Sequence, residues 1–105
     1  MPSEIPLACD MNAMTADQRQ RYEQIIPQLK ENILTVSDLP DGFDLHLPNS
    51  NLLLAAEFIS LEHLCCPFLR FELLIMPGED SAHLRLSGGE GVKEFLVGEL
   101  GLLGG

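Results

Sequence analysis

Apolar residues at helical spacing predict two long helices in this chain. Thr15 is a typical N-cap residue, and Gln18, three positions later, completes a capping box. The apolar positions that follow recur every three or four residues: Tyr22, Ile25, Ile26, Leu29 and Ile33. Pro27 falls inside this stretch, so we expect a kink there or a break just before it. A second helix is predicted over residues 52–65 and ends before Pro67, because the residue preceding a proline avoids the helical region.

Alternating or β-rich stretches predict strands between and after these helices. Residues 43–47 alternate cleanly and predict a half-buried strand, with residues 33–37 as its hairpin partner. Residues 68–76 and 82–87 predict a second hairpin. A short apolar stretch at 5–9 predicts an edge strand or extended arm, and a last helix is expected over 92–100.

The predicted order is therefore β-α-β-β-α-β-β-α. Its middle part consists of two helix-plus-hairpin units of similar length. Such units pack most simply as an antiparallel sheet with helices on one face. The fold class predicted is α+β, a two-layer sandwich, and residues 1–105 are expected to form a single domain because no linker divides them.

The charge balance excludes two classes of partner. The chain has 105 residues and a formal net charge of −10, from 16 acidic and 6 basic residues. Binding to nucleic acid or to an anionic membrane requires clustered Lys and Arg, which this chain lacks. A negative field instead concentrates cations and positively charged partners. The polar face of the predicted sheet is expected to be solvated and to carry cross-strand pairs, with a partner surface as the alternative. A protein partner or a homodimer therefore stays open. The residues of this face are Asp44, His46, Arg70, Glu72, His83 and Arg85.

The cysteines and the N-terminus bear on the compartment. Residues 1–6 lack the basic start and the long apolar run of a signal peptide, so none is expected, and no apolar run approaches the length of a membrane span. We therefore expect a cytoplasmic protein, in which thiols stay reduced. Three cysteines, an odd number, cannot all pair within the chain. Metal binding, redox chemistry or simple burial is then favoured over a disulfide framework.

The most informative motif is the adjacent pair Cys65-Cys66, preceded by Glu62 and His63 and followed by Pro67. Turning the predicted helix in 100° steps places Glu62 on its apolar side, within reach of both sulfurs. A carboxylate there is costly unless it is paired or coordinated.

Three readings of this motif compete. In the first, Glu62 pairs with an arginine such as Arg70, and the cysteines are inert core residues of a structural or interaction module. In the second, the thiols sense redox state, with Cys9 joined to one of the pair because adjacent cysteines form a strained ring. A thiol enzyme is disfavoured, since a helix C-terminus and Glu62 both raise the thiol pKa.

The third reading, a bound metal ion, is preferred because the same electrostatics favour a cation. Thiolates with a carboxylate or imidazole suit a soft or borderline ion such as zinc, copper or mercury. The predicted ligands are Cys9, Cys65, Cys66 and Glu62, with His63 as an outside candidate. The expected function is metal sensing, buffering or resistance.

The chain also resembles a small bacterial family without an established activity. The resemblance is carried by Glu-x-x-Cys-Cys-Pro-Phe-x-x-Phe at positions 62–71, by an early Leu-x-Cys at 7–9 and by the glycine-rich segment 86–95. In the family pattern an arginine often follows the glutamate, where this chain has His63. The resemblance implies a link to heavy-metal handling and no particular reaction.

Overall fold

The computed structural model describes residues 10–100, which contain three α-helices. They are α1 (Ala16–Asn32), α2 (Leu52–Cys65) and α3 (Val92–Leu100), and short 3-10 turns at Met11–Ala13 and Asn49–Asn51 precede the first two. The capping box of α1 is present: the Gln18 amide donates to the Thr15 hydroxyl, and the Gln18 side chain accepts from the Thr15 amide.

Four strands form one antiparallel sheet: β1 (Thr35–Leu39), β2 (Gly42–Pro48), β3 (Arg70–Ile75) and β4 (Ser81–Ser87). Their order across the sheet is β1-β2-β4-β3. Each hairpin thus contributes one central and one outer strand, and the pairing of β2 with β4 joins the two helix-plus-hairpin units.

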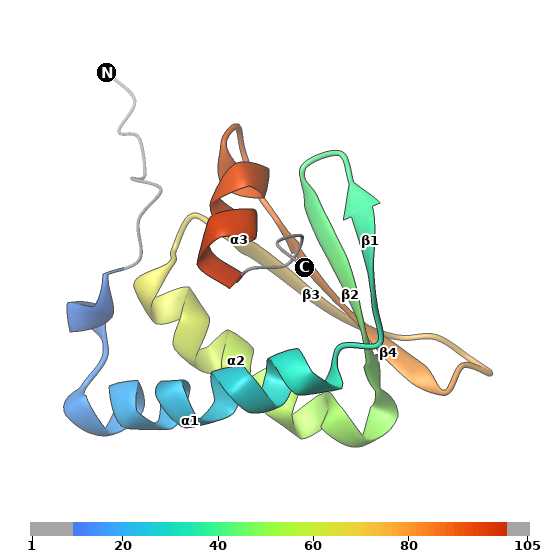
Figure 1. Cartoon of the computed structure of the whole chain (residues 1–105), viewed down its shortest axis with the longest axis horizontal. Helices are drawn as coiled ribbons and strands as arrows, with labels where there is room; N and C mark the ends of the chain where they lie inside the picture. Colours follow the sequence, from blue (N-terminus) through green and yellow to red (C-terminus); the bar gives the residue numbers. More distant parts are fainter. Residues whose placement is uncertain (1–9, 101–105) are drawn as a thin grey trace.

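The helices gather on one side of this sheet, as Figure 1 shows. Alternate residues of β2 and β4 point into the core between the layers, among them Phe43, Leu45 and Leu84, which are fully buried. Helix residues such as Ile25 and Phe58 meet them from the other layer. The predicted α+β class, antiparallel sheet and element order are confirmed, while the strand or arm expected at 5–9 lies outside the described residues.

Of the two outcomes expected at Pro27, the break does not occur, because α1 runs through that residue without interruption. A proline removes one helical hydrogen bond, the one that would end on the carbonyl of Glu23. Both residues are exposed, so water can satisfy that carbonyl. Ile25 and Leu29, on the opposite side, are buried in the core and hold both halves of the helix in place.

The segment before α1 is tied to the C-terminal end of α2. The amide of Asp10 donates to the carbonyl of Cys65 at 2.8 Å. The Arg19 guanidinium donates to the carbonyls of Met11 and Met14 at 3.3 and 3.2 Å, which holds the turn against α1. These contacts bring the start of the described chain to the cysteine pair.

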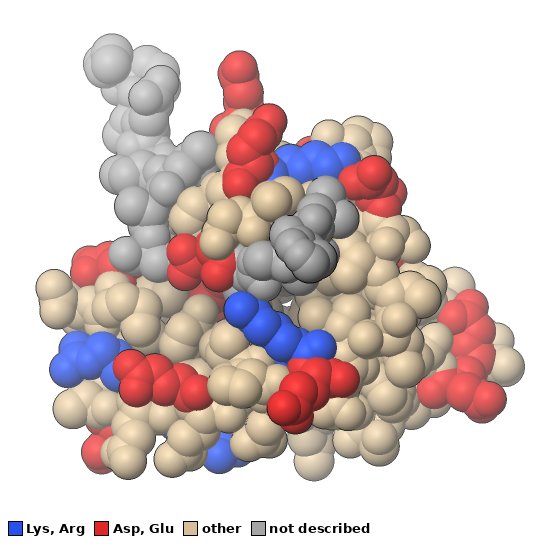
Figure 2. All heavy atoms as spheres, viewed as in Figure 1, with Lys and Arg blue, Asp and Glu red and all other residues tan. Residues whose placement is uncertain are grey.

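Acidic residues outnumber basic ones in this chain, 16 to 6. Figure 2 shows acidic side chains spread over the viewed face, with fewer basic ones between them. No helix within residues 10–100 combines the length and apolar character needed to cross a membrane.

Candidate metal centre

The candidate centre lies where α2 ends, and the local sequence explains the geometry. Cys65 is the last helical residue, and the Cys66 amide donates to the Glu62 carbonyl at 2.8 Å to close the final turn. Cys66 itself has a non-helical backbone, as expected for the residue before Pro67. Both cysteine side chains therefore turn inward from the helix end.

Three potential ligands meet there in the buried interior. Glu62, Cys65 and Cys66 are all 0% exposed, and one donor atom from each lies within 4.8 Å of the other two. The two sulfurs are 3.6 Å apart, and the Cys65 sulfur is 3.7 Å from Oε1 of Glu62. The predicted placement of Glu62 on the buried side of α2, beside both cysteines, is confirmed.

The arginine partner that the inert-core reading assigns to Glu62 is absent. Arg70 is exposed and its nearest carboxylate is that of Glu72, at 3.8 Å. Glu62 instead accepts a hydrogen bond from the Tyr22 hydroxyl at 2.6 Å through Oε1. Its second oxygen, Oε2, is buried and has no hydrogen-bond partner among the described residues. A buried carboxyl without a cation must take up either a proton or a positive ion.

The buried environment makes the protonated forms of these groups favourable in the absence of an ion. Burial raises the pKa of Glu62 above its ordinary value, although the hydrogen bonds from Tyr22 and Cys65 counteract this. Burial and the neighbouring carboxyl of Glu62 raise the pKa of the Cys65 thiol to about 12. The exposed carboxylate of Glu99 acts in the same direction on both groups. Cys65 is consequently a poor nucleophile at neutral pH.

The two adjacent cysteines differ in oxidation state. Cys65 is a free thiol, whereas Cys66 is disulfide-bonded. Cys9, the third predicted sulfur ligand, lies outside the described residues.

Two further residues depart from the sequence interpretation. His63 is exposed on α2 and is not part of the cluster of potential ligands. Tyr22, which contacts Glu62 from α1, was not predicted as a site residue. A signal existed, because a tyrosine in the apolar stripe of a helix buries its hydroxyl and usually needs a polar partner.

A scan against protein-family models, a search of curated proteins and a search of solved structures found no match to this chain.

Proposed function

We propose that this protein binds a soft or borderline metal ion through Glu62, Cys65 and Cys66. The observation that carries this proposal is the cluster of three buried donor groups with no cation beside the carboxyl among residues 10–100. Thiolates are the ligands preferred by zinc, monovalent copper and mercury. Metal sensing, buffering or resistance would each use such a centre.

Cys9 is proposed as the fourth ligand, which a tetrahedral ion requires. Asp10 follows Cys9 directly, and the Asp10 amide donates to the Cys65 carbonyl. The residue that follows Cys9 in the chain is thus held at the end of α2. Four donors, three sulfurs and one carboxylate oxygen, then match a closed structural or buffering site.

Tyr22 acts in this proposal as a positioning residue. Its hydroxyl donates to Oε1 of Glu62, the oxygen that lies 3.7 Å from the Cys65 sulfur, and so holds the carboxyl beside the thiols. Hydrogen bonds of this kind orient metal-ligating carboxylates and improve affinity. Binding releases protons, because Cys65 and Glu62 both have raised pKa values in the absence of metal.

The disulfide-bonded state of Cys66 favours a second candidate function, thiol redox sensing. Oxidation of two thiols to a disulfide releases two electrons and two protons to an oxidant such as a peroxide. A disulfide sulfur cannot serve as a thiolate ligand, so oxidation and metal binding compete for Cys66. The metal-binding form in our proposal is therefore the reduced protein.

A cadmium titration of the reduced protein tests the proposed function. We expect ultraviolet sulfur-to-cadmium charge-transfer absorbance from one thiol-bound ion per chain, after reduction by a phosphine and removal of oxygen. The Cys65→Ser variant should lose this absorbance, and Glu62→Gln should weaken affinity about tenfold or more, or about 1.4 kcal/mol. His63→Gln is the matched control and should bind like the wild type, because His63 is exposed and outside the cluster.

The same cadmium titration of the unreduced protein distinguishes metal binding from redox sensing and from an inert core. It should show no charge-transfer absorbance, because Cys66 is then unavailable as a thiolate. Absence of charge-transfer absorbance in both states would refute metal binding at the thiol centre and favour redox sensing or an inert core. Charge-transfer absorbance that survives Cys65→Ser would also refute the proposed centre.

A further inference from the structure

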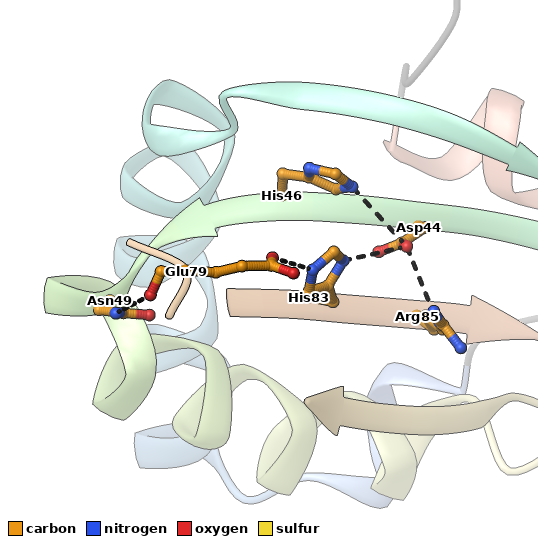
Figure 3. Close-up of polar contacts among 6 residues, drawn as sticks. All are labelled: Asp44, His46, Asn49, Glu79, His83 and Arg85. Atoms are coloured by element: carbon orange, nitrogen blue, oxygen red, sulfur yellow. Dashed lines mark hydrogen bonds and ion pairs between the residues drawn. The ribbon is translucent and has the colours of Figure 1, made fainter. Parts of the chain in front are cut away.

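A second cluster of potential ligands lies on the face of the sheet opposite the helices. Asp44 and His46 come from β2 and His83 from β4, and Figure 3 shows the three side chains converging. The strand register causes this, because His46 pairs directly with His83. Asp44 lies two residues from His46 on β2 and therefore shares the same face.

The distances within this cluster suit a small divalent ion. Nδ1 of His83 is 3.2 Å from Oδ2 of Asp44, and Nε2 of His46 is 3.7 Å from the same oxygen. Donor atoms around a tetrahedral zinc ion, each about 2.0–2.1 Å from it, are about 3.3–3.4 Å from one another. The cluster needs only small side-chain adjustments to reach that arrangement.

An unpartnered carboxylate oxygen points to a ligand. The Asp44 side chain is only 8% exposed, and its Oδ1 is buried without a hydrogen-bond partner among the described residues. A buried acceptor left unpaired costs free energy, so native structures rarely contain one without a reason. A metal ion that binds both oxygens of the Asp44 carboxylate would give Oδ1 that partner, while Oδ2 faces the histidines.

The His83 ring is held by a second carboxylate. Oε1 of Glu79 is 2.9 Å from Nε2 of His83, while Nδ1 faces Asp44. The turn that carries Glu79 is itself fixed, since the Asn49 side chain donates to the Glu79 carbonyl at 3.3 Å (Figure 3). A carboxylate on the outer nitrogen is the usual way to orient a metal-binding imidazole.

Both ring nitrogens of His83 thus face carboxylate oxygens. This arrangement requires positive charge on the ring or beside it. If Nε2 carries a proton toward Glu79, a neutral ring presents a lone pair at Nδ1 to the lone pairs of Asp44. Either a second proton or a metal ion must occupy that contact. The Arg85 guanidinium, 3.4 Å from Oδ2 of Asp44, supplies only part of the charge. Its side chain is 37% exposed, so it can move away when a cation binds.

We propose that Asp44, His46 and His83 bind a divalent first-row transition-metal ion, with zinc as the reference ion, while Glu79 positions the His83 ring. The open side of the sheet leaves the fourth position to water. This site uses nitrogen and oxygen ligands and no thiol, so it is independent of the centre at Cys65 and Cys66. It also binds zinc in the unreduced protein.

A zinc titration of the unreduced full-length chain, followed by nitrogen NMR of the histidine rings, tests this proposal. We expect one equivalent of zinc to shift Nε2 of His46 and Nδ1 of His83, the nitrogens that face Asp44. His63 should not respond, because it is exposed on α2 and outside the cluster. Unchanged His46 and His83 signals, or an equal response of all three rings, would overturn the proposal.

Two variants add readouts that a purely structural ion-pair cluster would not produce. Glu79→Gln should weaken zinc binding about tenfold, because the His83 ring loses its orienting carboxylate. Arg85→Gln should tighten zinc binding, because the competing cation beside Asp44 is removed. Weaker binding in Arg85→Gln would contradict the site. Neither variant should alter the cadmium absorbance of the reduced protein.

Discussion

At the scale of single residues, Glu62 is the most consequential side chain. It is fully buried, its only described hydrogen-bond donors are the Tyr22 hydroxyl and the Cys65 thiol, and one of its oxygens is left without a partner. Burying this acid costs free energy that a glutamine or leucine of similar size would avoid. A role that requires a carboxylate explains why the chain bears this cost.

The pH dependence of stability follows from the raised pKa of Glu62. Its folded pKa lies above the ordinary value of 4.5, so the folded state holds this proton more tightly than the unfolded state. The stability that Glu62 contributes is complete below the unfolded pKa and is lost as pH rises through the folded pKa. Urea unfolding of the metal-free protein should therefore show that Glu62→Gln gains stability relative to the wild type as pH increases. A difference between the two proteins that stays constant from about pH 4 to pH 8 would contradict this assignment.

At the scale of elements, the helices were the most predictable part of the molecule. The bounds predicted for the second and third helices, 52–65 and 92–100, are those of α2 and α3. Capping residues and Pro67 are local signals, so neighbouring sequence suffices to place such ends. Sequence spacing alone could not exclude a break before Pro27, because the effect of the proline depends on what packs on either side of it.

The capping box of α1 offers a direct check on this element. Thr15→Ala removes the hydroxyl that accepts from the Gln18 amide and should lower the free energy of unfolding by about 1 kcal/mol. Thr15→Ser keeps the hydroxyl and is the control. Denaturant unfolding measures both, and equal stability of Thr15→Ala and the wild type would show that the cap contributes nothing.

At the scale of the whole molecule, tertiary contacts bring together residues whose proximity the local sequence did not predict. Tyr22 and Glu62 are 40 residues apart, and only the packing of α1 on α2 brings them together. His46 and His83 face each other because of the register between β2 and β4. The polar character of that face was predicted from alternation, but the convergence of the two histidines on Asp44 depends on strand order. The proximity of Glu62 to the adjacent cysteines could be predicted without tertiary information, since all three residues lie at one helix end.

The two proposed sites also lie in different layers of the fold. The thiol centre is buried among the helices, whereas the histidine cluster is on the open face of the sheet. A net charge of −10 favours cations at both. Their ligand chemistry separates them, because sulfur selects soft ions and imidazole with carboxylate accepts borderline ones.

The most direct measurement of the central claim is X-ray absorption spectroscopy of the reduced protein with one equivalent of zinc. The His83→Gln variant is used so that the sheet face does not compete for the ion. We expect sulfur ligands at about 2.3 Å together with an oxygen ligand. A first shell made only of nitrogen and oxygen atoms, or zinc that remains hydrated in solution, would contradict this expectation.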